Sequence, residues 1–308
     1  MSRAIGILLG FAADRLIGDP RRFHPVAGFG RTAAKVEQQL YADTRPAGAA
    51  YAAVLVGAPT LLGIAAERLT RNHPILHTAV TAAATWTVLG ARSLDREAEA
   101  MAELLEDKDI DGARARLSHL CARDASDLEA DELARATVES VAENTSDACV
   151  APLLWGGVLG VPGLLGYRAA NTLDAMVGYK SPKYRRFGWA SARLDDVANL
   201  LPARACAVLA AVTSGRFQET VRVWRRDAAK HPSPNAGPVE AAFAGALELT
   251  LGGTNSYGSY QEDRGTLGDG PAPTVADVRR TAGLARRVGL AAAVLGAVVA
   301  LGKGKRWT

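Results

Sequence analysis

The sequence has few cysteines and lacks the short motifs that build the common nucleotide, zinc and hydrolase sites. Its 308 residues include 3 cysteines, an odd number without the close spacing of a zinc site or redox pair: Cys121, Cys149 and Cys206. We interpret all three as small apolar packing residues. The chain contains no Gly-x-x-x-x-Gly-Lys-Ser/Thr, Gly-x-Gly-x-x-Gly, Gly-x-Ser-x-Gly or His-Glu-x-x-His motif. Zinc chemistry and serine hydrolysis therefore lack support, and any nucleotide site must be of another kind.

The chain also has little excess charge. It contains 36 basic and 32 acidic residues, which gives a net charge of +4. No basic stripe is interleaved with the aromatic residues, which make up 6% of the chain. We therefore predict that the protein does not bind nucleic acid.

Long uncharged runs are the first positive signal. Ala49 to Ala66 and Pro74 to Gly90 approach the roughly 20 apolar residues that a helical membrane span needs. Val288 to Gly302 is shorter, but basic residues flank it on both sides, as they would flank an anchored span. Alanine-rich helices buried in a soluble bundle are the alternative interpretation. Val197 to Val212 is also apolar, but polar residues in its first half leave its placement open.

The amino-terminal apolar stretch does not have the pattern of a cleaved signal peptide. Ala4 to Ala13 is followed by Asp14 and Arg15, where a small-residue cleavage site would be expected. We expect a retained first helix that ends at Gly18-Asp19-Pro20, because this triplet is a strong stop signal.

These patterns predict an all-α fold, a polytopic membrane protein forming a single membrane-embedded domain over residues 1–308. Residues from about 92 to 147 are expected to form an extramembrane helical segment, and about 214 to 287 a polar loop region with a Gly-rich loop from Gly252 to Gly270. Ala148 to Gly166 is apolar but rich in glycine and proline. We predict that this broken or re-entrant segment turns back on itself.

Within the extramembrane segment, the spacing of apolar residues predicts a helix that begins near Arg92. Asp107 to Gly112 is interpreted as a turn, and Ala113 to about Cys121 as a second helix. Ser126 or Asp127 is expected to cap the helix that follows.

That helix carries a ladder of polar residues at spacings of three and four: Glu132, Arg135, Glu139, Glu143 and Asp147. Such spacing places all five on one helix face, where the four carboxylates repel one another. A solvated face with Arg135 as the only cation is one interpretation. The alternative is a functional site, because acids held near apolar walls need a cation, a proton or a ligand.

Several motifs, in order along nearly the whole chain, resemble the adenosylcobinamide-phosphate synthase (CobD/CbiB) family of cobalamin biosynthesis. The central ones are the runs Glu139 to Pro152, Asn171 to Lys180 and Ala192 to Asp196, followed by Pro202-Ala203-Arg204. The opening and closing motifs are Asp14 to Pro20, His24-Pro25-Val26, Ser233 to Gly237, Ala244 to Leu247 and Leu251-Gly252-Gly253. Departures such as Ala175, where the family usually has serine, leave the charged positions intact.

The resemblance implies a membrane-integral ligase that joins adenosylcobyric acid to an aminopropanol phosphate through an amide, with ATP as co-substrate and Mg²⁺ as cofactor. The implied partners are this corrinoid, the amino-alcohol phosphate and the lipid bilayer of the bacterial inner membrane, and a homo-oligomer is left open. Clustered acids would bind Mg²⁺, and basic side chains would bind phosphate.

The implied site residues fall into three groups. The predicted catalytic residues are Glu139, Glu143, Asn144, Asp147, Asp195 and Asp196. The predicted substrate-binding residues are Asp14, Asp19, His24, Asn171, Asp174, Lys180, Arg193, Arg204 and Asn235. The predicted magnesium ligands are Glu143, Asp147, Asp195 and Asp196.

A non-catalytic membrane protein is the competing hypothesis, either a transporter or a regulatory relative with the same fold. Broken helices and ionisable residues within the membrane would suit a transporter equally well. A regulatory relative would be expected to lose the Asn171 to Lys180 and Asp195-Asp196 motifs, and this chain has both.

Overall fold

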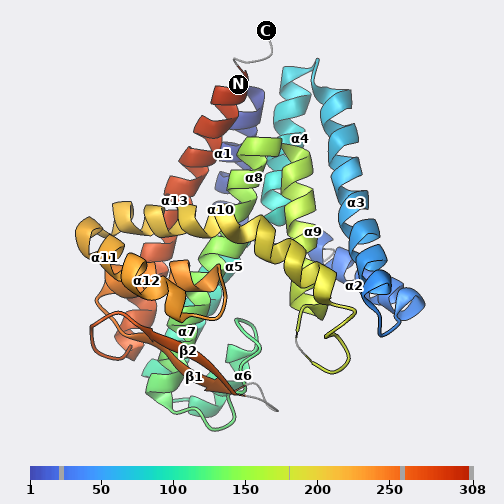
Figure 1. Cartoon of the computed structure of the whole chain (residues 1–308). Helices are drawn as coiled ribbons and strands as arrows, with labels where there is room; N and C mark the ends of the chain where they lie inside the picture. Colours follow the sequence, from blue (N-terminus) through green and yellow to red (C-terminus); the bar gives the residue numbers. More distant parts are fainter. Residues whose placement is uncertain (21–23, 180, 257–260, 305–308) are drawn as a thin grey trace. The chain divides into compact units, whose positions relative to one another are not determined.

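The computed structural model describes residues 1–20, 24–179, 181–256 and 261–304 and is dominated by α-helices (Figure 1). The helices are α1 (Ser2–Ile17), α2 (Pro25–Leu40), α3 (Arg45–Thr70), α4 (Pro74–Val88), α5 (Ala91–Glu106), α6 (Ile110–Leu117), α7 (Ala130–Thr145), α8 (Ala151–Leu159), α9 (Val161–Val177), α10 (Trp189–Ser214), α11 (Phe217–Asp227), α12 (Ala236–Leu247) and α13 (Val275–Gly304). A π-helical turn, η1 (Ser146–Val150), follows α7, and a 3-10 turn, η2 (Ala228–Lys230), follows α11. The predicted all-α class is confirmed.

The chain divides into two compact units that alternate along the sequence. Unit 1 comprises Met1–Gly90, Ala151–Asn199 and Ala293–Thr308, and unit 2 comprises Ala91–Val150 and Leu200–Ala292. Helices α10 and α13 each contribute one part to each unit. The expectation of one domain over residues 1–308 stays a prediction.

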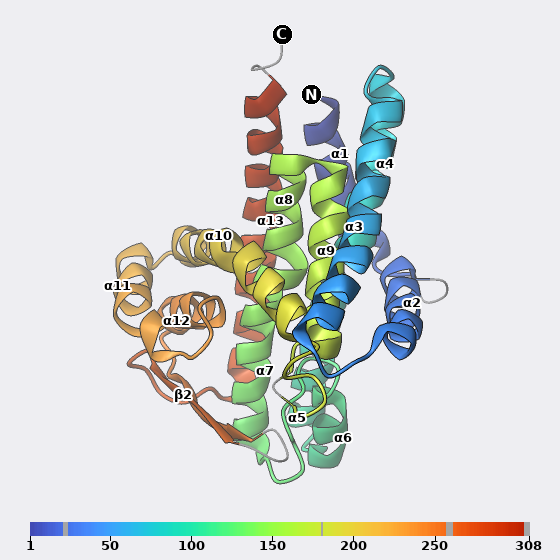
Figure 2. The same ribbon diagram turned by 45° about the vertical axis from the view of Figure 1, so that its right-hand side comes forward.

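Unit 1 is built from helix pairs, and its main pairs are α1 with α4, α3 with α9, and α8 with α9 (Figure 2). Helices α8 and α9 are joined by Gly160, which adopts φ 74°. This left-handed conformation favours glycine, and a Cβ here would also overlap the carboxylate of Glu67. The predicted reversal within 148–166 is therefore confirmed, and it takes place at one residue.

Two contacts fix the direction of α9 against α3. The α3 residue Gly63 lies against Pro162 at the start of α9, whereas Gly48 near the start of α3 lies against Phe187, beyond the end of α9. The two helices are therefore antiparallel. The carboxyl end of α9 and the amino end of α3 lie at the same end of unit 1.

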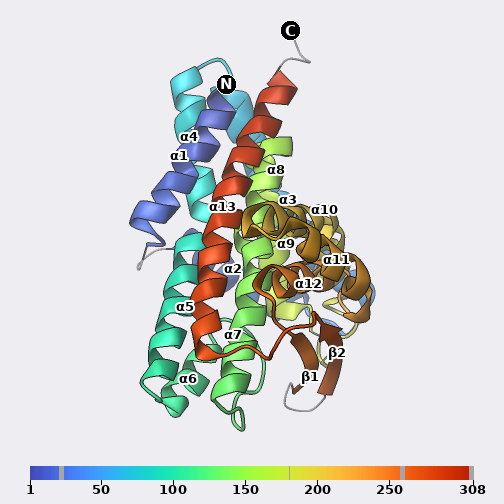
Figure 3. The ribbon, with the colours of Figure 1, turned by 90° about the vertical axis from the view of Figure 1, so that its left-hand side faces the viewer.

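Unit 2 is organised around α7, which packs against α5, α6 and α12 (Figure 3). Every residue of α12 is buried. The predicted Gly-rich loop instead contains an antiparallel pair of strands, β1 (Leu251–Ser256) and β2 (Gln261–Leu267), with an irregularity in register between Gly252 and Thr254. Pairing of the two strands satisfies backbone N–H and C=O groups of this segment. The glycine-rich composition alone did not predict this pairing.

Two predicted boundaries in unit 2 are wrong. Helix α6 begins at Ile110, because the Asp109 side chain accepts a hydrogen bond from the Gly112 backbone N–H and caps the helix there. Helix α7 is capped by Glu129 instead of Ser126 or Asp127, in a capping box that Glu132 completes.

Three helices among the described residues are long and apolar enough to cross a membrane: Arg45–Thr70, Trp189–Ser214 and Val275–Gly302. Each carries exposed apolar side chains at helical spacing, such as Leu290, Val294 and Val298 on α13. Exposed stripes of this kind are expected where a helix faces lipid. The predicted span from Pro74 to Gly90 forms α4, whose 15 residues are fewer than a typical span needs.

Candidate active site

The predicted polar ladder is not a solvated face, because Glu139 in its middle is fully buried. One carboxylate oxygen of Glu139 accepts a hydrogen bond from Arg123, and the other accepts one from the backbone N–H of Gly252 at 2.8 Å. Arg135 lies one turn before Glu139, 3.7 Å from its carboxylate, and also donates to the Gly252 carbonyl. Helix α7, the preceding loop and the hairpin therefore meet at one carboxylate.

Arg264 on β2 connects two more glutamates to this region. Its Nη1 atom lies 3.1 Å from Glu240 on α12 and 3.6 Å from Glu143 on α7. The Glu240 side chain is fully buried, and its Oε2 atom has no hydrogen-bond partner among the described residues. Glu143 is the accessible member, with 29% of its side chain exposed.

His231 closes the buried side of the cluster. Its Nδ1 atom accepts a hydrogen bond from the Ser233 backbone N–H at 2.9 Å, so in the neutral ring Nε2 carries the proton. This Nε2 lies 3.5 Å from Glu240 Oε1. We call the assembled group the glutamate–arginine cluster: Arg123, Arg135, Glu139, Glu143, His231, Glu240 and Arg264.

Loss of solvent dominates the electrostatics of this cluster. Burial, followed by the charges of Glu143 and Glu139, raises the pKa of Glu240 well above its ordinary value, against the opposing effect of Arg264. Burial also raises the pKa of Glu143, and Arg264 again opposes the shift. For His231, burial and the charge of Arg264 lower the pKa to about 4. Burial thus disfavours the charged form of each of these three groups.

The other predicted residues of unit 2 lie outside this cluster. The Asn144 side chain donates to the carbonyls of Ser140 and Leu120, at 2.9 and 3.3 Å, and so holds the loop after α6. Asp147 lies in η1 rather than on a continuous α-helical face. Arg204 donates to the Asn235 side chain at 3.2 Å, so this predicted pair does come together.

In unit 1 the structure brings together four of the predicted residues. Asp195 is almost fully buried, and its two oxygens accept hydrogen bonds from Asn171 at 3.3 Å and from Asn199 at 3.0 Å. Tyr167 donates to Asn199 at 2.9 Å and extends this network. Asp174 lies within electrostatic range of both Asp195 and Asp196.

Asp196 is 3.3 Å from Arg193, its neighbour one turn away on α10. Lys180 lies outside the described residues. Near the amino terminus, His24 Nε2 lies 3.3 Å from Asp19, while its Nδ1 accepts from the Val26 backbone N–H and caps α2. Asp14 is fully buried in α1.

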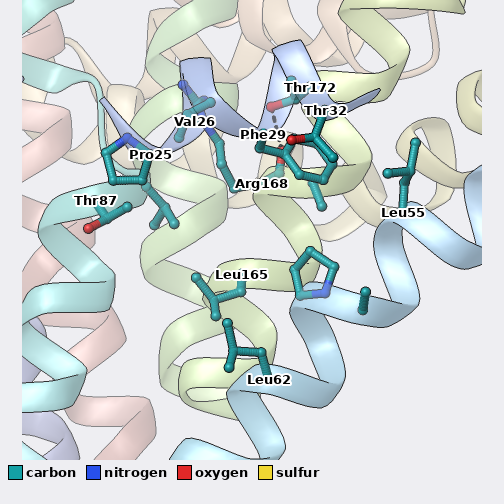
Figure 4. A pocket seen from close by; sticks show the side chains of 14 residues that line it. Pro25, Val26, Phe29, Thr32, Leu55, Leu62, Thr87, Leu165, Arg168 and Thr172 are labelled. Carbon is teal, nitrogen blue, oxygen red and sulfur yellow. Dashed lines mark hydrogen bonds between the residues drawn. The ribbon is translucent and has the colours of Figure 1, made fainter. Parts of the chain in front are cut away.

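An apolar cavity of about 360 Å³ lies in unit 1 between α2, α3, α4 and α9 (Figure 4). Two of its few polar groups, the hydroxyls of Thr32 and Thr172, donate to carbonyls of their own helices. Among the described residues that line it, Arg168 alone is charged. The cavity therefore offers hydrophobic contact but no acid–base pair.

The predicted magnesium ligands do not form a ready-made metal cage. Among the described residues, no group of three or more His, Cys, Asp or Glu side chains is arranged to hold a metal ion. Both oxygens of Asp195 are occupied by amides, and Glu143 and Asp196 face arginines. As arranged, these carboxylates do not form an all-protein cage for a resident Mg²⁺, and the predicted magnesium ligands stay a prediction.

From the sequence, no role was assigned to four members of the cluster: Arg123, His231, Glu240 and Arg264. One signal was available for Glu240, because it is the only charged residue in the apolar segment Ala236–Leu247. A lone acid at the centre of a buried helix requires a partner or a proton.

The chain matches a family model described as CobD/Cbib protein over residues 7–285. It is 56% identical over 299 residues to the cobalamin biosynthesis protein CobD of Mycobacterium tuberculosis (strain ATCC 25618 / H37Rv), covering 96% of this chain and 95% of that protein. The protein of the same name from Chromobacterium violaceum is 43% identical over 311 residues, with 96% and 98% covered. That from Geobacter metallireducens is 42% identical over 274 residues, with 85% and 86% covered. No solved structure matches the chain.

Proposed function

The chain belongs to the CobD/Cbib protein family of cobalamin biosynthesis, and from this premise we propose that it is an ATP-dependent carbon–nitrogen ligase. Its substrates are adenosylcobyric acid and an aminopropanol phosphate, and its product is adenosylcobinamide phosphate. The proposed location is the inner membrane of a bacterial cell, in keeping with the three candidate spans.

The observation that carries this proposal is the glutamate–arginine cluster, because it combines a partly exposed acid with buried cations. Amide formation from a carboxylate needs an activated acyl group. In the proposed sequence, a substrate carboxylate oxygen attacks the γ-phosphorus of ATP and ADP leaves. The amine nitrogen then attacks the acyl carbon, the C–N bond forms, and the bond from carbon to the phosphate oxygen breaks.

The incoming amine must lose a proton before it can attack. Glu143 suits this role because it is partly exposed and because burial raises its pKa, which makes its carboxylate a stronger base. Arg264, 3.6 Å from Glu143, suits the charge of a phosphoryl oxygen. Mg²⁺ would enter with the nucleotide phosphates, which requires only one or two protein carboxylates.

A direct assay tests the proposal. Purified protein in detergent would receive ATP, Mg²⁺, adenosylcobyric acid and aminopropanol phosphate, with the corrinoid amide followed by mass spectrometry and ADP by a coupled reaction. We expect both products in equal amounts. Absence of both would refute the ligase assignment.

Two substitutions test the role of the cluster. Glu143→Gln is expected to lower kcat by about 100-fold or more, the usual contribution of a general base. Asp131→Asn, an exposed acid on the same helix, is the matched control and should keep wild-type turnover. Normal turnover by Glu143→Gln would remove Glu143 from the mechanism.

Transport is the second candidate function, because one candidate span carries charged residues. Helix α10 contains Arg193, Asp195, Asp196 and Arg204. Polar groups along a spanning helix are typical of a substrate pathway. Uptake of labelled corrinoid into proteoliposomes, without ADP or amide formation, would favour transport over ligation.

A further inference from the structure

A second cavity in unit 1, of about 530 Å³, is lined by four of the described residues, and three of them are arginines: Thr44, Arg45, Arg185 and Arg186. All four side chains are exposed. We call this cavity the arginine pocket. None of the described residues that the sequence assigned to the site lines it.

The loop that carries Arg185 and Arg186 is fixed to α3 by the residue that follows them. The ring of Phe187 lies between those of Tyr41 and Tyr51, with centroid distances of 5.2 and 5.0 Å. The Phe187 carbonyl also approaches Gly48 so closely that any Cβ there would overlap it. The two arginines are thus held beside the first turn of α3.

A second anchor lies on the other side of the loop. Glu37 on α2 accepts hydrogen bonds from Lys183 at 2.7 Å and from the Tyr184 hydroxyl at 2.9 Å. These contacts position the backbone just before the arginines. The fold therefore holds the backbone that carries two of the three arginines.

The pocket carries more positive than negative charge. Arg186 lies 3.9 Å from Asp43, and both side chains are more than half exposed. Arg45 stacks on the ring of Trp189, with 5.2 Å between its Cζ atom and the ring centroid. Within the described part of the chain, neither Arg45 nor Arg185 pairs with a carboxylate. Three guanidinium groups beside one carboxylate favour an anion, and their planar donors match phosphate oxygens.

The position of the pocket indicates where that phosphate comes from. Arg45 begins α3 and Trp189 begins α10, and both helices are candidate membrane spans. Further along both helices apolar side chains are exposed, with Val54 on α3 and Val197 on α10 exposed by 55% and 64%. Partly exposed aromatic rings and basic residues at such a boundary are typical of the lipid headgroup level.

We propose that the arginine pocket binds the phosphate headgroup of an anionic phospholipid. The exposed lining and the neighbouring apolar helix surfaces favour a lipid over a soluble phosphate, because a lipid can place its headgroup in the pocket and its chains against α3 and α10. The proposal concerns an additional site and does not depend on the ligase assignment.

The test measures binding of short-chain dihexanoyl-phosphatidylglycerol, and of the matched phosphatidylcholine, to the purified chain in an uncharged detergent by titration calorimetry. The double variant Arg185→Gln/Arg186→Gln removes two charges from the pocket. Each basic residue near anionic lipid contributes about fivefold in affinity, so the double variant should bind phosphatidylglycerol on the order of 30-fold more weakly. The control Arg68→Gln/Arg71→Gln removes two exposed cations at the other end of α3 and should bind like wild type.

Three results would overturn the proposal. The first is equal affinity of wild type for phosphatidylglycerol and phosphatidylcholine. The second is equal weakening by the control pair, which would indicate a general charge effect. The third is displacement of phosphatidylglycerol by inorganic phosphate or ATP, which would make the pocket a soluble-phosphate site. Should the double variant not fold, Arg185→Gln alone is measured and is expected to lose about fivefold.

Discussion

The two units bury acidic residues in different ways. In unit 2, Glu139 is neutralised by charge, with Arg123 hydrogen-bonded to it and Arg135 3.7 Å away. In unit 1, Asp195 is held by two neutral amides and has no cationic partner among the described residues. Removal of either partner of a buried ion pair strongly destabilises the fold, because the remaining charge is buried without compensation. Replacement of an acid that is held by side-chain amides removes only hydrogen bonds.

The largest effect that this comparison predicts is that of Glu139→Gln. The substitution removes the buried carboxylate charge that is hydrogen-bonded to Arg123, which should lower the free energy of unfolding by about 3 kcal/mol. Denaturant unfolding in detergent, followed by circular dichroism, would measure it. The exposed Asp131→Asn on the same helix should stay within about 0.5 kcal/mol of wild type. Equal losses in both variants would contradict the importance of the ion pair.

The next largest predicted effect is a dependence of the free energy of unfolding on pH. Because the pKa of Glu240 is raised in the folded chain, the folded state keeps a proton that the unfolded chain loses near pH 4.5. The free energy of unfolding should therefore fall as pH rises from 4.5 through the raised pKa. Glu240→Gln removes this contribution, so its stability relative to wild type should increase over that range. The expected gain is about 1.4 kcal/mol for each tenfold difference in proton affinity between the folded and unfolded chains.

His231 should change the free energy of unfolding with pH in the opposite direction to Glu240, and it serves as the control. Its pKa is lowered to about 4, so between pH 6.5 and 4 the unfolded chain binds a proton that the folded chain does not. Its contribution to stability is therefore lost as pH falls through that window, and His231→Gln should remove this loss. A difference between Glu240→Gln and wild type that does not change with pH would show that Glu240 titrates normally.

Asp195→Asn should cost less than Glu139→Gln. The new amide nitrogen would face one of the donor groups of Asn171 or Asn199, so one buried hydrogen bond is lost without leaving an unpaired charge. The expected cost is about 1 to 2 kcal/mol, measured by the same unfolding experiment. A cost equal to that of Glu139→Gln would mean that the charge of Asp195 is itself compensated, and the contrast between the units would disappear.

The smallest effect on stability is expected for Asp196→Asn. Its pair with Arg193 spans one turn of α10, and 68% of the Arg193 side chain and 35% of the Asp196 side chain are exposed. Loss of such a partly exposed pair should change the free energy of unfolding by no more than about 0.5 kcal/mol. If Asp196 acts in the proposed reaction, kcat should fall while the thermal midpoint stays constant. Unchanged turnover would exclude Asp196 from the mechanism.

The sequence predicted secondary-structure elements better than it predicted the interaction partners of charged side chains. The reversal at Gly160 could be foreseen, because glycine and proline break helices whatever surrounds them. The burial of Glu139 could not, because its partners Arg123 and Gly252 lie 16 and 113 residues away along the chain. The same holds for Arg264, which meets Glu240 only because β2 folds against α12.

By itself, the sequence determined the helical class, the apolar candidate spans, the reversal between α8 and α9 and the membership of the CobD/Cbib family. These features are set by periodicity, breakers and local motifs, which neighbouring residues encode. Only the tertiary structure decided which acids are paired with arginine, which are held by amides and where three arginines form a pocket. Burial and charge pairing join distant segments, so a linear pattern does not contain them.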